Sequence, residues 1–409
     1  MRILSLGLVA TLVLVLPAVA RAADWPQYGG PDRNAVSRET AWKADWSGGP
    51  KVLWKAEVGA GYASVAVLRG RVYTMGAGGG GEEGGRRGGR GGRGGPSAVV
   101  CLDADTGAEL WRTPLGGGEN AATPAVDDRA VYAVAPDGTV GCLALADGAI
   151  KWQTNLVRDH GVQRGGWQIA CSPLLEGSAI ILDAGKTIAL EKSTGKVLWS
   201  AGGAKAGYAS TIPFKIGAKA YLTSFNGAGL AIVDAASHQV VATQPWQTAH
   251  DVNSALPMIA GDKIFICSGY GRGAGLVQFD GSGARLLYDK KVLRAHCNGP
   301  VLIGGYLYGL DGQMGSSGAL QCVEMATGEV KWAAPVKIGA MSAAGDRLIV
   351  QADGGEVLIA QASPAGYKCL ARAQVLDGKC WTMPILANAR IHARSHSGRV
   401  VCLDVAAGR

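Results

Sequence analysis

The sequence contains little charge and few of the residues that build helical bundles. Only four of its 409 residues are Phe and charged residues make up 18%, whereas Gly occurs 63 times. This composition argues for many tight turns and small side chains rather than for long helices. No helical periodicity of any length follows residue 22, although hydrophobic residues, at 48%, suffice for a buried core. The pattern therefore predicts an all-β protein.

Cysteine motifs are also absent. The nine Cys residues cannot all pair, and neither C-x-x-C nor C-x-x-C-H occurs, which excludes zinc ribbons, thioredoxin-like sites and c-type haem attachment. Cys369 and Cys380 could form a disulfide, since exported compartments allow disulfides without requiring them. Four other cysteines share one position of a repeat that Ala189 and Ile232 fill elsewhere, which favours a small buried apolar residue there. These four are Cys101, Cys142, Cys322 and Cys402.

Signatures of common catalytic centres are missing as well. No G-x-S-x-G nucleophile elbow occurs. The run Gly269–Gly275 resembles a phosphate loop, but no helix follows it to supply N-terminal amides. The formal net charge of +8 permits anionic partners without establishing them.

Residues 1–22 have the pattern of a secretory signal. Arg2 precedes the apolar run Ile3–Leu16, and a small-x-small cleavage site follows at Ala20–Ala22. The run is short for a membrane anchor, which is the alternative. No Cys follows the cleavage site, so a lipid anchor is not indicated. We therefore expect an exported protein, periplasmic or secreted, with no integral membrane segment after signal cleavage.

A short unit recurs along the chain with a fixed internal spacing. An acidic or small residue is followed by a Thr-Gly-type turn, and a Trp lies eight positions after it. Such recurrence indicates one supersecondary unit that buries its apolar face on its neighbours. The four clear copies run from Asp103 to Trp111, from Ala144 to Trp152, from Glu191 to Trp199 and from Glu324 to Trp332.

Each unit is predicted to be a four-stranded meander. Within residues 121–156, short apolar runs are separated by Asp137-Gly138 and Asp147-Gly148, which favour hairpin turns. Eight units can be counted. They begin near Tyr62, Ala122, Cys171, Ser210, Ser254, Asn298, Met341 and Thr382.

The eighth unit is incomplete, and its missing strand lies at the other end of the chain. The last unit ends at Val401–Val405, whereas Lys51–Val58 forms an additional predicted strand. Pairing of this N-terminal strand with the C-terminal blade would close a ring and remove two sheet edges that an open solenoid leaves exposed. We therefore expect residues 51–405 to form an eight-bladed β-propeller of four-stranded antiparallel blades.

Two segments lie outside the repeat. Residues 23–50 contain Trp25, Trp42 and Trp46, and we expect this segment to pack outside the ring. Gly78–Gly95 is a Gly/Arg-rich insertion that cannot bury enough apolar area to become ordered, so we expect disorder. Arg-Gly segments can hold single-stranded nucleic acid, but this one has no interleaved Phe or Tyr. A tolerated loop expansion is the preferred interpretation, and nucleic-acid binding is not expected.

The residues that interrupt the repeat gather on one face of the predicted ring. This connector face holds the connections between blades and the loop between the second and third strands of each blade, while the Thr-Gly turns lie on the opposite turn face. Aromatic, imidazole, guanidinium and amide groups around a central channel suit an anionic or polyhydroxylated ligand. The candidate ligand-binding residues are Tyr62, Arg164, Trp167, Gln168, Tyr208, His250, Asn253, Arg294, His296, Asn298 and Trp381.

Two other interpretations of this face stay open. The same side chains could hydrogen-bond the connector backbone, which must satisfy its own polar groups. A metal site could use the imidazole and oxygen donors of His250, Asp251, Asn253, His296 and Asn298. Their spacing matches no compact ligand motif, so we predict no metal site.

The Asp103–Trp111 unit resembles the Trp-docking repeat of the pyrroloquinoline-quinone (PQQ)-type propellers, and the resemblance covers nearly all of residues 51–405. In that family the outer-strand Trp packs between blades. The resemblance implies this structural role for Trp54, Trp111, Trp152, Trp199 and Trp332. Four segments are also similar to exported bacterial propellers without an assigned activity, namely Trp25–Pro31, Gly61–Ser64, Cys267–Gly271 and Gly378–Thr382.

The resemblance implies three possible functions. Quinoprotein dehydrogenases hold the quinone and calcium in the channel, typically with two adjacent bonded Cys residues, but no adjacent Cys pair occurs here and their calcium ligands and base cannot be matched. The propeller lipoprotein of the outer-membrane barrel-assembly machine is a non-catalytic scaffold with a lipidated Cys, which this chain lacks. Many exported relatives have no assigned activity.

We therefore expect an exported, non-catalytic binding or scaffold protein, with no catalytic residues and no cofactor. Its connector face would bind a protein, peptide or carbohydrate ligand. The alternative is a PQQ-dependent dehydrogenase with Ca²⁺ that oxidises an alcohol or sugar, with Arg164, Trp167, His250 and Trp381 near the cofactor.

Overall fold

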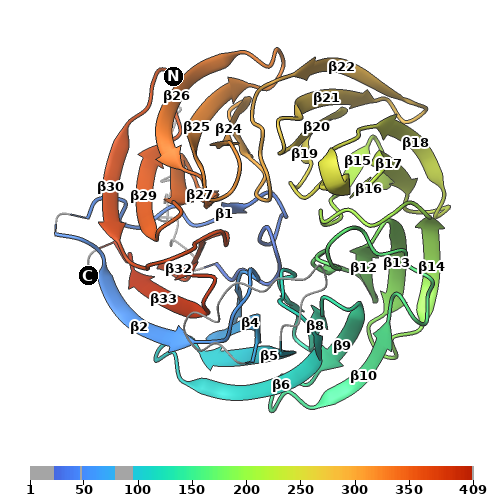
Figure 1. Ribbon diagram of the computed structural model, residues 1–409, viewed down its shortest axis with the longest axis horizontal. Helices are drawn as coiled ribbons and strands as arrows, with labels where there is room; N and C mark the ends of the chain where they lie inside the picture. Colours follow the sequence, from blue (N-terminus) through green and yellow to red (C-terminus); the bar gives the residue numbers. More distant parts are fainter. Residues whose placement is uncertain (1–22, 47, 79–94, 408–409) are drawn as a thin grey trace, which may run out of the picture.

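The structure is a computed structural model that describes residues 23–46, 48–78 and 95–407. Eight sheets stand around a central axis like the blades of a propeller (Figure 1). The predicted eight-bladed, all-β fold is confirmed. The expected signal at residues 1–22 and nearly all of the Gly/Arg-rich insertion lie outside the described residues. Within the described ranges, no helix is long and apolar enough to cross a membrane.

Blades 1 to 4 are four-stranded antiparallel meanders whose first strand lies innermost. Blade 1 consists of β3 (Ala66–Leu68), β4 (Arg71–Ala77), β5 (Pro96–Asp103) and β6 (Glu109–Gly117). Blade 2 consists of β7 (Ala125–Val126), β8 (Val131–Val134), β9 (Thr139–Leu143) and β10 (Ile150–Asn155). Blade 3 consists of β11 (Leu174–Glu176), β12 (Ala179–Asp183), β13 (Lys186–Glu191) and β14 (Val197–Gly202). Blade 4 consists of β15 (Pro213–Ile216), β16 (Lys219–Asn226), β17 (Gly229–Asp234) and β18 (Val240–Pro245).

Blades 5 to 8 complete the ring. Blade 5 follows a short 3₁₀ helix, η1 (Ala249–Asp251), and consists of β19 (Met258–Ala260), β20 (Lys263–Ser268), β21 (Gly273–Phe279) and β22 (Ala284–Lys290). Blade 6 consists of β23 (Val301–Ile303), β24 (Tyr306–Asp311), β25 (Ser317–Glu324) and β26 (Val330–Lys337). Blade 7 consists of β27 (Ala340–Ala344), β28 (Arg347–Gln351), β29 (Glu356–Gln361) and β30 (Cys369–Gln374), with β1 (Val36–Ser37) added at its inner edge. Blade 8 consists of β31 (Ile385–Ala387), β32 (Arg390–Arg394), β33 (Arg399–Asp404) and β2 (Lys51–Glu57).

The two ends of the propeller meet in blade 8, as predicted. Strand β2 is the outermost strand of this blade and pairs antiparallel with β33, which places Trp54 opposite Cys402. One sheet therefore holds residues from both ends of the chain, and the ring is closed by hydrogen bonds rather than by loop contacts alone.

Outer-strand aromatic side chains join neighbouring blades. In five places a Trp or Tyr of one blade donates a hydrogen bond to a backbone carbonyl in the outer turn of the next blade. The pairs are Trp54 with Ala104 (2.9 Å), Trp111 with Leu145 (3.1 Å), Trp152 with Lys192 (2.9 Å), Tyr288 with Met325 (2.8 Å) and Trp332 with Ser363 (2.7 Å). Trp199 instead stacks on His238 of blade 4, with ring centroids 4.5 Å apart.

The glycine of the Thr-Gly turn explains the spacing of the repeat. A Cβ on Gly107 would lie 2.6 Å from the ring of Trp54, and a Cβ on Gly148 would lie 2.5 Å from the ring of Trp111. Both glycines also have positive φ angles, 72° and 74°, which a residue without a Cβ adopts without strain. The turn needs glycine both for its backbone conformation and for the close approach of the indole.

The repeat cysteines pack in the core beside these indoles. Cys101 lies opposite Trp111 in the sheet, and Cys142 lies opposite Trp152. Both side chains are buried, as expected for small apolar residues. All nine cysteines are free thiols, so Cys369 and Cys380 do not pair.

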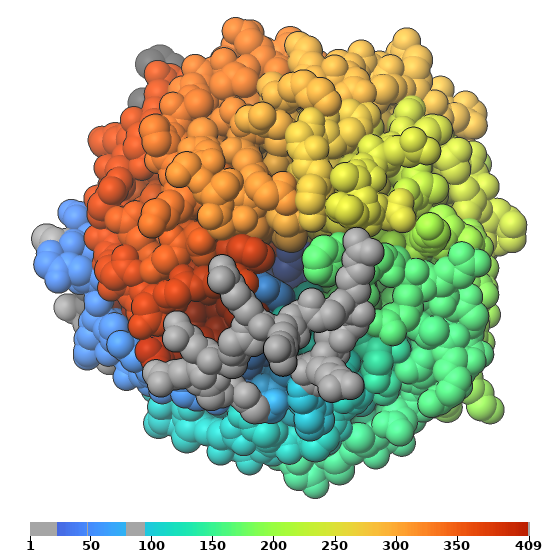
Figure 2. All heavy atoms as spheres, viewed as in Figure 1, coloured from blue at the N-terminus to red at the C-terminus, as the bar shows by residue number. Residues whose placement is uncertain are grey.

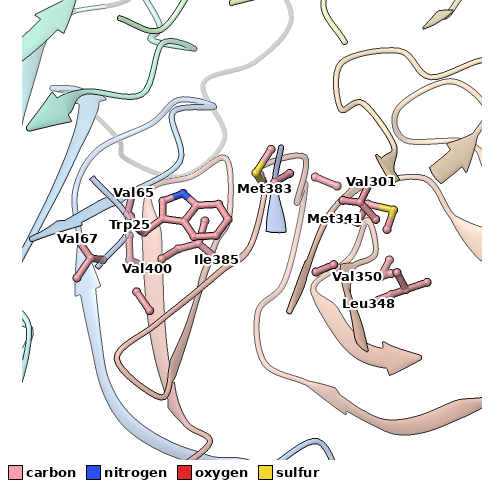
Figure 3. Close-up of a cluster of buried hydrophobic side chains, with 14 of the residues drawn as sticks. Trp25, Val65, Val67, Val301, Met341, Leu348, Val350, Met383, Ile385 and Val400 are labelled. Atoms are coloured by element: carbon pink, nitrogen blue, oxygen red, sulfur yellow. The ribbon is translucent and has the colours of Figure 1, made fainter. Parts of the chain in front are cut away.

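The first part of the N-terminal segment, residues 25–37, does not lie outside the ring, and the expectation for Trp25 was wrong. The backbone of Trp25 pairs with Val67 of β3, and Figure 3 shows its indole near Val65, Ile385 and Val400. Only 1% of the Trp25 side chain is exposed. The segment therefore packs against the inner side of the ring and fills part of the channel.

The segment takes this position because the innermost strand of each blade has backbone groups without a neighbouring strand, and the segment can hydrogen-bond to them. The carbonyl of Pro26 accepts a hydrogen bond from the Val126 amide of β7 (2.8 Å), and β1 pairs in parallel with β27. Satisfying such groups and burying an indole outweighs the cost of ordering the segment. Trp42 and Trp46 pack against a core cluster of blades 7 and 8.

Asp183, at the end of β12, is a buried carboxylate. Its Oδ1 accepts hydrogen bonds from the Ser224 hydroxyl (2.8 Å) and the Gly185 amide (3.3 Å), while Oδ2 has no partner among the described residues. Burial raises the pKa of Asp183 to about 6. The folded protein therefore favours the protonated form of this side chain.

We expect Asp183→Asn to stabilise the protein at pH 8 by about 1–2 kcal/mol more than at pH 4, where the carboxyl is mostly protonated in the folded protein and close to its unfolded pKa. The pKa of Asp183 is higher in the folded than in the unfolded chain. The resulting stability is present below the unfolded value and is lost as the pH rises through about 6. Thermal unfolding at both pH values measures the effect, with the exposed Glu176→Gln in the same blade as control. Equal shifts at the two pH values would contradict it.

Candidate functional site

A cavity of about 350 Å³ opens at the centre of the connector face. Figure 2 shows this hollow, with blue N-terminal residues visible at its bottom. Tyr28 of the N-terminal segment lines the cavity together with Ser172 and Ser210, which precede the innermost strands of blades 3 and 4. The segment that was expected outside the ring thus forms part of the site.

Seven of the eleven candidate ligand-binding residues line this one cavity. They come from connectors before blades 1, 3, 4, 6 and 8, which the ring brings to a common centre. These residues are Tyr62, Trp167, Gln168, Tyr208, His296, Asn298 and Trp381.

The other four candidates do not line the cavity. Arg164 and His250 are exposed, and His250 packs edge-on against Tyr270 at 5.6 Å between ring centroids. Arg294 forms an ion pair with Asp311, 2.5 Å from nitrogen to oxygen.

Asn253 is fully buried and serves the connector backbone. Its Nδ2 donates to the carbonyls of Asn226 (2.7 Å) and Trp246 (3.1 Å), and its Oδ1 accepts from the Ser268 hydroxyl (2.7 Å). With every polar atom engaged, Asn253 fixes the connector between blades 4 and 5. This is the structural alternative described above for such residues.

The sequence interpretation missed several lining residues. Tyr28 lies in the segment that was placed outside the ring, and Cys297 and Met383 each follow or precede a predicted residue in the same connector. Tyr270 belongs to the Gly-rich β20–β21 loop, which opens onto the connector face and therefore offered a signal.

A polar rim borders the cavity where blades 8, 1 and 2 meet. The rings of Tyr62 and Trp381 stack at 5.7 Å between centroids, and the Lys379 ammonium lies 4.6 Å from the Trp381 ring centroid. His396 packs 4.5 Å from Tyr62 and hydrogen-bonds Glu119, which holds the pKa of that carboxyl below its usual value. These contacts fix the orientation of the two aromatic rings.

The cavity wall itself is uncharged at neutral pH. Among the described residues that line it, none is Asp, Glu, Lys or Arg. Desolvation lowers the pKa of His296 to about 4 and raises the pKa values of Tyr28 and Cys297 to about 12. A charged ligand group placed inside would lose its hydration without gaining a counter-charge, which is strongly unfavourable.

The described residues contain no group of three or more His, Cys, Asp or Glu placed to hold a metal ion. Of the donors considered for such a site, Asn253 is fully engaged elsewhere and His296 faces a neutral cavity. The cavity is therefore organised around aromatic, hydroxyl and amide groups.

Comparison with known proteins places the chain in a family. The PQQ_2 family model, described as outer membrane protein assembly factor BamB, matches residues 33–255 and 216–334. BamB of Moranella endobia is 25% identical over 283 residues, covering 63% of this chain and 66% of that protein. BamB of Yersinia pestis is 27% identical over 278 residues, covering 64% and 66% respectively. The chain thus spans 66% of the length of these curated relatives.

Solved structures show the same fold at low sequence identity. BamB from Moraxella catarrhalis superposes with a TM-score of 0.59 and 16% identity, covering 87% of this chain and 99% of that one. Quinohemoprotein alcohol dehydrogenase from Comamonas testosteroni superposes with a TM-score of 0.67 and 13% identity, covering 96% of this chain and 82% of that one. An outer membrane protein assembly factor and an alcohol dehydrogenase share this architecture, so the fold alone does not assign an activity. On the extent of the family match, the chain belongs to the PQQ_2 family of β-propellers.

Proposed function

We propose that the protein is an exported, non-catalytic binding or scaffold propeller that takes a protein, peptide or carbohydrate ligand in the cavity of its connector face. The observation that supports this most is the uncharged, aromatic lining of the cavity, with Trp167 64% exposed. Exposed aromatic side chains around a preformed hollow are typical of ligand sites. The relatives named as outer membrane assembly factors favour a binding role over a catalytic one.

The cavity lining also lacks an activated catalytic group. His296 is neutral and poorly basic because desolvation lowers its pKa to about 4, and the buried Cys297 thiol has a pKa raised to about 12. A thiol in this state is a weak nucleophile, since the thiolate is the reactive form. His296 Nδ1 hydrogen-bonds the Gln313 amide (3.1 Å) rather than a carboxylate, and neither side chain has an activating partner among the described residues.

PQQ with calcium is a poor fit to this lining. PQQ has three carboxylates, and both it and Ca²⁺ require opposite charges or many oxygen ligands at the site. Two buried guanidinium groups are already engaged, Arg33 with the Pro173 carbonyl (2.9 Å) and Arg394 with four oxygens of blade 1 and the connector before it. The proposal therefore assigns no redox step to these residues.

We expect PQQ and Ca²⁺ to leave the thermal unfolding midpoint of the purified protein unchanged and to support no dye reduction with alcohols or aldoses. The reason is the missing counter-charge in the cavity, because a ligand that binds only the folded state would raise the midpoint. A known apo-quinoprotein, reconstituted in the same buffer, controls for the quality of the reagents. Saturable stabilisation together with turnover would reject the binding role in favour of a dehydrogenase.

A further inference from the structure

We propose that the cavity binds a neutral saccharide ring of a larger glycan. This inference rests on the proposed binding role and specifies its ligand class. Two kinds of observation support it, namely polar side chains that line the cavity, two of which carry a donor without a partner among the described residues, and flat aromatic surfaces at its mouth.

The first unpaired donor is the amide of Asn298, which is only 5% exposed. Its Oδ1 accepts a hydrogen bond from the Met341 amide (2.8 Å), and this fixes the orientation of the side chain, because a backbone N–H can only donate. Nδ2 lies near the Tyr28 hydroxyl but has no partner with hydrogen-bonding geometry among the described residues. A buried donor left in this state is unfavourable unless a ligand or water accepts from it.

The second donor is the indole of Trp381, which lines the same cavity from the connector before blade 8. Its Nε1 is buried and has no acceptor in the described part of the chain. The hydroxyls of Ser172 and Ser210 accept hydrogen bonds from the amides of Thr123 (2.9 Å) and Ser172 (2.8 Å), so each retains a proton to donate. The cavity lining thus combines hydroxyl, amide and indole groups, which suit a ligand rich in hydrogen-bonding oxygens.

The mouth of the cavity supplies the complementary apolar contacts. The indole of Trp167 is 64% exposed and the ring of Tyr270 is 37% exposed, although both belong to a preformed hollow. The C–H groups on one side of a pyranose ring carry slight positive charge and pack on the negative face of such aromatic rings. A sugar therefore matches the wall with its hydroxyls and the mouth with its ring face.

Charge and backbone geometry favour a neutral sugar over a peptide. An extended peptide would bind by adding to a free strand edge. The inner edges of blades 1, 2 and 7 already contact the N-terminal segment through Val67, Val126 and β1. Acidic sugars and peptide termini would bring charges that the neutral wall cannot compensate. Neutral hydroxyls, which both donate and accept, satisfy the wall without this penalty.

The test measures binding of maltohexaose, cellohexaose, xylohexaose, mannohexaose and chitohexaose by intrinsic Trp fluorescence and calorimetry. Trigalacturonate serves as the acidic comparison and a pool of uncharged peptides as the alternative ligand class. We expect at least one neutral hexasaccharide to bind saturably. Trp167→Ala and Trp381→Phe should each raise its Kd by about tenfold, because the first removes a stacking surface and the second removes a donor together with part of the ring.

Matched controls keep the result interpretable. Trp167→Ala removes a side chain that is mostly in water, so the variant should fold normally, and circular dichroism checks this. Tyr367→Ala removes an aromatic side chain, 37% exposed, from the turn between β29 and β30 on the opposite face. It should leave the Kd unchanged.

The outcomes separate this inference from the function on which it rests. Failure of all five neutral sugars to bind at about 10 mM would overturn the saccharide assignment, since a Kd above that range reflects negligible affinity. Peptide binding that is lost in Trp167→Ala would then preserve the binding role. Sugar binding that is insensitive to both variants would overturn this cavity as the site. Turnover with PQQ would reject the binding role itself.

Discussion

Replacing Trp54 with Ala should lower the free energy of unfolding by about 3–5 kcal/mol. The indole is 7% exposed, lies on Gly107 of the next blade and donates a hydrogen bond to the Ala104 carbonyl (2.9 Å). The variant would lose the buried area, leave a cavity and leave this carbonyl unpaired. Because Trp54 belongs to the closing strand β2, the loss falls on the joint between the two ends of the propeller.

Denaturant titration measures this loss. Trp54→Phe keeps an aromatic ring but removes the donor. Its loss of unfolding free energy should therefore be about 1–2 kcal/mol smaller than that of Trp54→Ala. Trp167→Ala, whose side chain is mostly exposed, should change stability by less than about 0.5 kcal/mol. A loss under about 1 kcal/mol for Trp54→Ala would contradict a closing role for β2.

Arg394→Met should also cost about 3–5 kcal/mol. The Arg394 guanidinium is buried and donates to the carbonyls of Ala63 (2.6 Å), Met75 (2.8 Å) and Gly59 (2.8 Å), and to the Thr74 hydroxyl (2.8 Å). Met fills much of the space of the Arg stem but supplies no donor. Several buried oxygens of blade 1 and its connector would lose their hydrogen-bond partner at once.

A surface arginine of the same blade provides the control. Arg399 is 43% exposed at its side chain and pairs with Glu57 at 2.8 Å, so Arg399→Met should cost less than about 1 kcal/mol. Urea unfolding of both variants under identical conditions gives the comparison. Similar losses for the two substitutions would show that the interior hydrogen bonds of Arg394 contribute no more than a surface ion pair.

The fold could be predicted because its determinants are local and repeated. The turn sequence recurs because the packing recurs, as where Gly107 leaves room for the indole of Trp54. The outer strand that the eighth unit lacks could be recognised in the sequence at Lys51–Val58. The path of the N-terminal segment was not predictable in this way. Its position depends on unpaired inner strand edges, to which Val126 and Ala343 contribute, and no periodicity in residues 23–37 encodes those partners.

The candidate site was predictable as a region more than as a list of residues. Connector residues such as Tyr62 and Trp381 converge because any ring brings its connectors to one centre. Whether a connector side chain faces the hollow or the backbone depends on single contacts. Asn253 and Asn298 occupy comparable positions before blades 5 and 6, yet the first has every donor satisfied and the second does not.

The pairing of β2 with β33 has a consequence for how the molecule is made. These partners lie about 350 positions apart, and such distant contacts form slowly because a long loop must close first. Until the last residues arrive, seven blades can stack while the closing strand β2 has no partner and exposes a ladder of free amides and carbonyls. During synthesis the nascent protein is therefore vulnerable to self-association, and a helper that shields β2 until β33 is made would raise its yield more than one that assists any interior blade.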